Sequence, residues 1–286
     1  MSNQIGFWDI MYAFRKIALS DMAQIRKLRN SKENRLTATA FESLYSWREY
    51  FGFSVYTEPD FALVYSSLLD GYMYPFGDAA KSDEFIRAAA KEKKKFVFLS
   101  EEQAKLLEAQ GFSISESRDS DEYVYESHAL ALRSGEISAN LKRKCKTFLK
   151  NHSVDVIPID ESNLSDAAAL MRSLGSERGD REAAEALLNG FLTLRPKGIL
   201  LKTESGSAMI MGYENTADIF TMTVVVYDSA LGNDAVPICI NKLAELVCDE
   251  FDYIDLEEDM GIEGLRTMKQ LYKPKFMLRS YTGTVL

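Results

Sequence analysis

The order of hydrophobic patterns in the second half of the chain constrains the fold most. Runs rich in β-branched and aromatic residues alternate with stretches whose apolar residues recur every three to four positions. The expected order is helix, helix, three strands, helix, strand, helix and strand, at residues 161–174, 181–194, 198–204, 208–213, 219–227, 235–250, 253–256, 261–272 and 276–281. Strands that alternate with helices predict a mixed central sheet flanked by helices.

The first half repeats this mixture. Helices are expected at residues 20–30, 41–51, 83–94 and 100–110, and strands at 55–56, 61–65 and 95–99. The helix after Ser100 has the clearest limits, because a serine cap and two glutamates open it and Gly111 follows its end. The chain has 286 residues, enough for two modest domains. We therefore predict two α/β (α+β) domains, 1–125 and 126–286.

Composition excludes several classes of function. The net charge of −9 argues against a surface that binds nucleic acid or anionic membranes as a whole, so such binding needs a local basic patch. The three cysteines form no CxxC pair, and two histidines cannot supply a three-histidine site, so no metal or disulfide framework is expected. The N-terminus lacks the pattern of a signal peptide, and no apolar run reaches 18 residues, which predicts a cytoplasmic protein without a transmembrane segment.

One local basic patch is present. Residues 142–150 hold five cations and no acid, and the surrounding apolar residues have helical spacing. Such a run suits phosphate groups, so Lys142, Arg143, Lys144 and Lys146 are candidate substrate-binding residues. The alternative is an ordinary solvated helix face.

The most informative stretch is 254–274, which is expected to form a strand end, an acidic turn and a helix. Ile262, Leu265, Met268 and Tyr272 share one helical face and are expected to pack on the sheet. Arg266 and Lys269 lie at other positions, where they can reach solvent or a ligand. Eight acidic residues lie between 249 and 263, whereas 264–286 contains none. Carboxylates before a helix are favoured by its dipole, so capping explains part of this pattern.

This stretch closely resembles the end of the phosphatidylglycerol lysyltransferase C-terminal-domain-like family, which carries a pattern like I-N-x-E-x-D-x-G-x-x-G-L-R-x-x-K-x-x-Y-x-P. The residues in register are Glu257, Asp259, Gly261, Gly264, Leu265, Arg266, Lys269, Tyr272 and Pro274. Stretches at 41–48, 74–77, 121–125 and 130–135 are similar too, so the resemblance covers essentially the whole chain. It implies two tandem GNAT-like acyltransferase domains, an architecture shared with Fem-type aminoacyltransferases.

The resemblance also implies a chemistry. Lysyltransferases of this group move an aminoacyl unit from charged tRNA to phosphatidylglycerol. We therefore expect transfer of an acyl or aminoacyl group from a coenzyme A thioester or aminoacyl-tRNA to an amine or hydroxyl of a lipid headgroup or peptide, with no permanently bound cofactor. Glu257 or Asp259 is the expected base or orienter, and Tyr272 the expected proton donor to the leaving group. Arg266 and Lys269 are expected to hold an anion.

Departures from the family pattern keep a second function open. Asp255 and Leu256 stand where relatives have Asn and Arg, and the run 224–228, Val-Val-Val-Tyr-Asp, replaces a polar run like H-x-E-K-A. The following loop, 229–233, has one glycine with which to cradle a pyrophosphate. The alternative is therefore a catalytically degenerate GNAT-like protein that binds an anionic ligand without chemistry.

Overall fold

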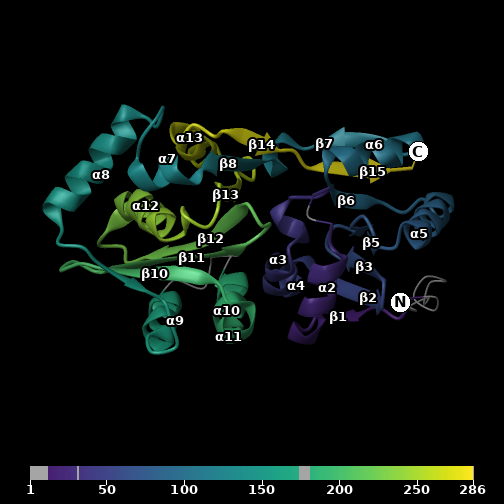
Figure 1. Ribbon diagram of the computed structural model, residues 1–286, viewed down its shortest axis with the longest axis horizontal. Helices are drawn as coiled ribbons and strands as arrows, with labels where there is room; N and C mark the ends of the chain where they lie inside the picture. Colours follow the sequence, from purple (N-terminus) through teal and green to yellow (C-terminus); the bar gives the residue numbers. More distant parts are fainter. Residues whose placement is uncertain (1–11, 31, 174–180, 286) are drawn as a thin grey trace, which may run out of the picture. The chain divides into compact units, whose positions relative to one another are not determined.

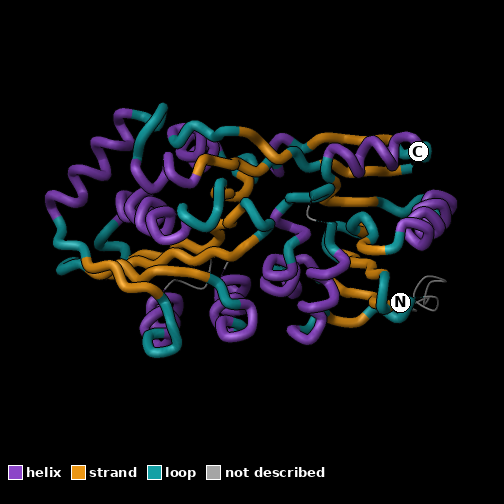
Figure 2. Tube along the Cα trace, viewed as in Figure 1, coloured by secondary structure: helices purple, strands orange, loops and turns teal. Residues whose placement is uncertain are grey.

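The computed structural model describes residues 12–30, 32–173 and 181–285, which form two compact units. Unit 1 comprises the chain up to Ser117 together with the segment from Ser280 onward, and unit 2 comprises Arg118–Arg279. Each unit contains one mixed sheet flanked by helices (Figure 1, Figure 2), which confirms the predicted α/β class. Among the described helices, none has both the length and the apolar composition needed to cross a membrane.

Unit 1 is built on a sheet of eight strands among its described residues. Its elements are β1 (Arg15–Lys16), η1 (Leu19–Asp21), α2 (Met22–Leu28), η2 (Thr37–Thr39), α3 (Phe41–Ser46), α4 (Arg48–Phe51), β2 (Phe53–Glu58), β3 (Phe61–Ser66), β4 (Gly71–Tyr72), β5 (Phe76–Gly77), α5 (Ala79–Lys91), β6 (Phe96–Leu99), α6 (Glu101–Ala109), β7 (Ser113–Glu116) and β15 (Tyr281–Thr284). The strand order is β1-β2-β3-β4-β6-β15-β7, with β5 paired to β3. β4 and β6 are parallel and meet through one residue pair, Tyr72 and Phe96.

Both faces of this sheet are covered. On β3, Phe61 and Leu63 belong to the apolar cluster that α5 and α6 complete, whereas Ala62 and Val64 face the other way and are also buried. The predicted cap of α6 is present, because the hydroxyl of Ser100 accepts a hydrogen bond from the backbone amide of residue 103. The α5 helix begins four residues earlier than the expected 83–94, because Asp78 caps it.

Unit 2 is built on a seven-stranded sheet among its described residues. Its elements are η3 (Arg118–Ser120), β8 (Glu122–Glu126), α7 (Ser127–Leu132), α8 (Ala139–Asn151), β9 (Asp155–Pro158), α9 (Leu164–Ser173), α10 (Arg181–Asn189), α11 (Phe191–Leu194), β10 (Lys197–Lys202), β11 (Ser207–Glu214), β12 (Ile219–Tyr227), η4 (Gly232–Asp234), α12 (Ala235–Val247), β13 (Tyr253–Glu258), α13 (Glu263–Leu271) and β14 (Phe276–Leu278). The strand order is β14-β8-β13-β12-β11-β10-β9. Helices α7, α8 and α12 cover one face, and α9 to α11 lie on the other (Figure 1).

The β12 strand carries one extra residue, Thr223, in its ladder with β11. Met222 pairs with Gly212, and Val224 pairs with Met211, so Thr223 has no partner residue across this ladder. An arrangement of this kind is a β-bulge, which bends the strand and re-aims the side chain of the extra residue.

This bulge changes which β12 residues enter the core. Met222 and Val225 are three positions apart, yet both contact the core formed with α7, α8 and α12. Strict alternation would have sent them to opposite faces. The neighbouring β11 backbone is tight, because a Cβ on Gly212 would lie 2.1 Å from the carbonyl oxygen of Thr221.

The two central strands of unit 2 pair over a short length only. The parallel ladder between β12 and β13 joins residues 219–221 to residues 253–255. Beyond Thr221, the described ladder of β12 is with β11 alone. Beyond Asp255, β13 has a second irregularity, at which its register with β8 shifts before Glu258. The two strands therefore stop pairing where the acidic turn begins.

The chain exchanges strands between the two sheets. β8 follows β7 in sequence but lies in the second sheet, between β13 and β14. β15 follows β14 but lies in the first sheet, between β6 and β7. The expected last strand, 276–281, is therefore two strands in different sheets. The predicted domain limits, 1–125 and 126–286, do not coincide with the limits of the compact units.

Candidate functional site

The site begins where β12 and β13 stop pairing. Glu257 lies there with a φ of 61°, a left-handed conformation that is uncommon for a residue with a side chain. Its backbone amide donates a hydrogen bond to the carboxylate of Asp255, at 2.7 Å, and this bond closes the turn. Such strain is typical of functional positions when the surrounding contacts hold it in place.

The surroundings of Glu257 raise the pKa of its carboxyl group. Its half-buried side chain accepts a hydrogen bond from Thr223, the bulged residue of β12. Loss of water around the group, followed by repulsion from Glu258, raises the pKa of Glu257 to about 8, although Thr223 and Lys269 act in the opposite direction. A carboxyl that titrates near neutral pH can both accept and return a proton during a reaction.

Lys269 binds the backbone of the turn at residues 256–258. Its side chain is 5% exposed, and its Nζ donates hydrogen bonds to the backbone carbonyls of Leu256 (2.5 Å), Glu257 (2.9 Å) and Glu258. Burial lowers the pKa of Lys269, while the nearby carboxylates oppose this shift. The three carbonyls use all three of its N–H donors, so Lys269 holds the unusual backbone at Glu257.

Asp259 is the centre of a dense network of donors. Its buried carboxylate accepts from Arg266 Nε and Nη2, both at 2.8 Å, from the Tyr123 hydroxyl at 2.5 Å, from the Gly261 amide at 2.9 Å and from Arg118 at 3.4 Å. The Arg266 guanidinium, above all, holds the pKa of Asp259 well below its usual range. A carboxylate so fully engaged is a poor proton acceptor.

Arg266 links this network to η3, at the start of unit 2. Its Nη2 also donates to Asp119 at 2.6 Å, and its side chain is 34% exposed. Arg266 thus bridges two carboxylates, one buried and one exposed. The bidentate geometry toward Asp259 suits a fixed structural pair.

The structure places Tyr272 away from the contacts of Glu257. Its ring packs edge-on against Tyr125, with centroids 5.9 Å apart, and burial raises the pKa of its hydroxyl. That hydroxyl has no hydrogen-bond partner among the described residues. It lines a small cavity between α7, α8 and α12, together with Cys145, Lys142 and Asn241.

The basic run forms the exposed face of α8. Leu141, Cys145 and Phe148 point into the core. The four predicted cations differ in their contacts: Lys142 donates to the Gly135 carbonyl at 3.1 Å, Arg143 donates to Asn140 at 2.9 Å, Lys144 lies 3.8 Å from Asp234, and Lys146 is exposed with no ionic or hydrogen-bond partner among the described residues.

The structure therefore brings together Glu257, Asp259, Arg266 and Lys269, and it separates Tyr272 and the α8 cations from them. Sequence reasoning missed Thr223, although Thr223 immediately precedes the apolar run 224–226 that was singled out. It also missed Arg118, Asp119 and Tyr123 as partners of the network. Tyr123 belongs to a stretch, 121–125, that was noted for its resemblance to the family.

Comparison with known proteins places the chain in a family. The model of the family described as "Phosphatidylglycerol lysyltransferase, C-terminal" matches residues 29–283. No curated protein matches the sequence.

Solved structures agree with this assignment. A conserved protein of unknown function from Bacteroides thetaiotaomicron is similar over 96% of this chain and 100% of its own, with 23% identity and a TM-score of 0.84. The C-terminal domain of a proposed lysylphosphatidylglycerol synthetase from Agrobacterium fabrum (12% identity, coverage 93% and 91%) gives 0.63. FemX (11% identity, coverage 96% and 97%) gives 0.58. These similarities confirm the tandem GNAT-like, Fem-type fold. Because the family match spans most of the sequence, the chain belongs to the phosphatidylglycerol lysyltransferase C-terminal family.

Proposed function

We propose that this protein is an acyl- or aminoacyl-transferase in which Glu257 is the general base. The observation that carries the proposal is the position of this carboxyl group. It lies where β12 and β13 stop pairing, it accepts a hydrogen bond from Thr223, and its pKa is raised toward neutral pH. The family's transferase members support the reaction class.

In the proposed reaction, the carboxylate of Glu257 takes a proton from the acceptor's amine or hydroxyl. The acceptor nitrogen or oxygen then bonds to the donor's carbonyl carbon. The bond from that carbon to the donor's sulfur or ribose oxygen breaks, and the departing group receives the proton from Glu257. The backbone of Thr223, which has no partner residue in the ladder, is a candidate to polarise the donor carbonyl.

The other residues of the 254–274 stretch take positioning roles in this proposal. Asp259 and Arg266 fix the turn through their mutual ion pair, and Lys269 fixes it through the three carbonyls. Asp259 is not the base in this proposal, because its carboxylate already accepts hydrogen bonds from Arg266 and Tyr123. Tyr272 is not assigned a proton-transfer role, because its described contacts do not include Glu257.

The α8 cations are proposed to bind phosphates of the donor, either coenzyme A or tRNA. Lys144 lies near Asp234, at the N-terminal end of α12, so the basic face is close to a helix end whose dipole also favours anions. Charge reversal of Lys142, Arg143, Lys144 and Lys146 is expected to weaken donor binding and to flatten its salt dependence. Unchanged affinity and salt slope would leave only a solvated helix face.

The proposal is tested with purified protein, coenzyme A thioesters and charged tRNAs, with products read by mass spectrometry. Glu257→Gln is expected to reduce the transfer rate by about 10²–10⁴-fold while the protein remains folded. Glu263→Gln is the matched control, because it removes an exposed carboxylate at the start of α13 that does not act on Glu257, and it is expected to keep most activity. Equal losses in the two variants would contradict a base role for Glu257.

A second candidate is a protein that binds an acyl donor without chemistry. It is favoured by the apolar side chains of Val224, Val225 and Val226, which follow Thr223 where relatives carry a polar run. In the same experiment, this candidate predicts donor binding that depends on α8 and no transfer to any acceptor.

A further inference from the structure

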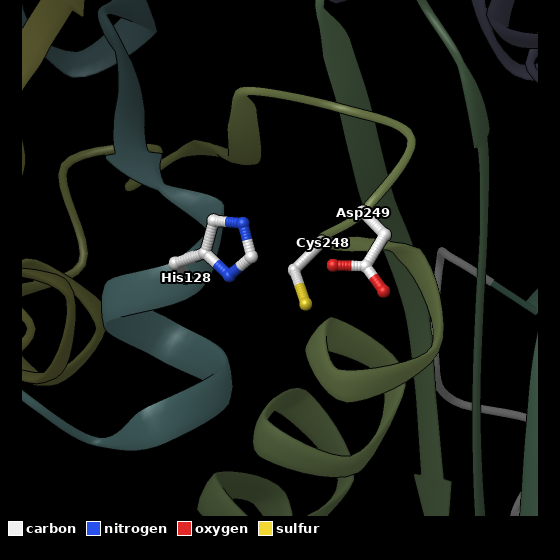
Figure 3. A group of neighbouring side chains, drawn as sticks. All are labelled: His128, Cys248 and Asp249. Carbon is white, nitrogen blue, oxygen red and sulfur yellow. The ribbon is translucent and has the colours of Figure 1, made fainter.

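A cluster of potential metal ligands lies on unit 2, separate from the site around Glu257. The imidazole of His128, the thiol of Cys248 and the carboxylate of Asp249 each offer a ligand atom, and these atoms lie within 4.8 Å of one another. Figure 3 shows the three side chains gathered between α7, which carries His128, and the end of α12, which is followed by Cys248 and Asp249.

The three groups have almost no competing partners. His128 and Asp249 make no hydrogen bond or ion pair with the rest of the described chain. The Cys248 thiol makes one weak contact, in which it donates to the Glu245 carbonyl at 3.9 Å. His128 and Asp249 are exposed and Cys248 is half-buried, so an ion can reach all three from solvent.

The backbone around the cluster is held by independent bonds. The Ser127 amide donates to the Asp252 carbonyl at 3.0 Å, and Glu126 pairs with Tyr253 in the sheet. Asn241 clamps α12 to α7, because its side-chain amide donates to the carbonyls of Leu130 at 2.9 Å and Ala131 at 2.6 Å. The two segments that carry the ligands are therefore held without a metal ion, which lowers the entropic cost of binding.

We propose that His128, Cys248 and Asp249 bind a zinc ion, with water as the fourth ligand. A thiolate, an imidazole and a carboxylate match the ligand preferences of Zn²⁺, whereas Mg²⁺ and Ca²⁺ prefer oxygen alone. Zinc bonds of about 2.0–2.3 Å need ligand atoms roughly 3–4 Å apart, and the three ligand atoms here lie within 4.8 Å of one another. The site is also at the C-terminal end of α12, where the helix dipole favours a cation.

The site is tested on tag-free full-length protein that has been stripped of metal and kept reduced. Co²⁺ is added as a spectroscopic probe, and the wild-type protein is expected to show thiolate-to-cobalt absorption that one equivalent of Zn²⁺ removes. Cys248→Ser is expected to abolish this absorption, and His128→Gln and Asp249→Asn to weaken affinity at least about 10-fold. All three substitutions are at accessible positions, so metal-free melting temperatures should match that of the wild type.

His152→Gln is the matched control, because it removes the other histidine of the chain, which instead pairs with Glu204. It should bind cobalt like the wild type. Absorption that persists in Cys248→Ser, equal weakening by His152→Gln, or no thiolate absorption in the wild type would each overturn the proposal. None of these outcomes depends on transferase activity, so the test is independent of the proposed function.

Discussion

Among the described residues, each sheet contains one short parallel junction, where two parallel strands pair over a few residues, and the side chains around the two junctions differ in character. In unit 1, Tyr72 and Phe96 meet among packed rings, with Phe85 6.2 Å and Phe112 5.4 Å from the Phe96 ring. In unit 2, the strands diverge beside Glu257 and Lys269, and the nearby Lys269 lowers the pKa of Glu257. The same local topology therefore supports an apolar joint in one unit and a titratable site in the other.

The two junctions are expected to differ in how their contributions to stability depend on pH. Apolar packing around Phe96 is expected to contribute the same stability at pH 5 and pH 9, because no carboxyl, imidazole or amino group belongs to its apolar cluster. The unit 2 junction depends on which carboxyl groups are charged.

Removing the ring at the unit 1 junction should destabilise the protein most. Phe96 is fully buried, so Phe96→Ala loses its apolar contacts and leaves a cavity, which is expected to cost about 3–5 kcal/mol of unfolding free energy. The loss should be equal at pH 5 and pH 9 in denaturant titrations. Leu106→Ala, at an exposed position of α6, is the control and should cost far less. A loss that varied with pH would break the contrast.

The loss of stability caused by Asp259→Asn, unlike that of Phe96→Ala, should depend on pH. It removes the buried charge that faces Arg266 and Arg118, which is expected to cost about 3 kcal/mol at pH 7, the lower end for a buried pair because both arginines are partly exposed. Since the folded pKa lies below the unfolded value of 3.8, the wild type loses this advantage as the pH falls below 3.8. Asp252→Asn, at an exposed position, is the control. A loss that persists unchanged in acid would show that charge is not the cause.

Glu257→Gln should stabilise the protein in alkaline solution. The folded carboxyl has a pKa of about 8 and the unfolded one about 4.5, so the folded state keeps its proton longer. As the pH rises from 4.5 to 8, ionisation therefore favours the unfolded state, and the wild type loses stability that the glutamine variant keeps. The melting temperature of the variant should exceed that of the wild type at pH 8.5, and the gap should close near pH 4.5. A variant that is less stable at pH 8.5 would show that the carboxylate is stabilising.

Thr223→Val should have the smallest effect on stability, within about 1 kcal/mol, because it removes one hydroxyl and keeps the side-chain shape. Thr223 lowers the pKa of Glu257, so its loss should raise that pKa further. The pH range over which Glu257 destabilises the fold should then extend further upward, while its lower end stays at the unfolded pKa of 4.5, and the pH profile of any transfer reaction should move upward. Profiles that coincide with the wild type would place Thr223 outside the site.

Much of this fold could be predicted because periodicity is a local property. The strands at 198–204, 208–213 and 219–227 overlap β10, β11 and β12, and the expected helix at 235–250 overlaps α12. The cap at Ser100 was predictable for the same reason, since both of its partners lie within one turn.

The remainder depends on contacts that no local pattern contains. The bulge at Thr223 is a relation between two strands, and the arginine partner of Asp259 in η3, Arg118, lies 141 residues before it. Lys269 has the spacing of a solvent-facing cation, yet it is buried because the turn at 256–258 folds back over it. His128 and Cys248 meet only because β8 lies next to β13.

Because β15 returns to the first sheet, this sheet cannot be completed until unit 2 has been synthesised. β6 and β7 emerge early, but the strand that lies between them follows unit 2 in the sequence and is made after it. At roughly 5–20 residues per second, translation of unit 2 separates β7 from β15 by about 10–30 s. During this interval the nascent first unit carries two strand edges without their partner. Chaperones that recognise such edges would have their longest opportunity to bind this chain before β15 leaves the exit tunnel.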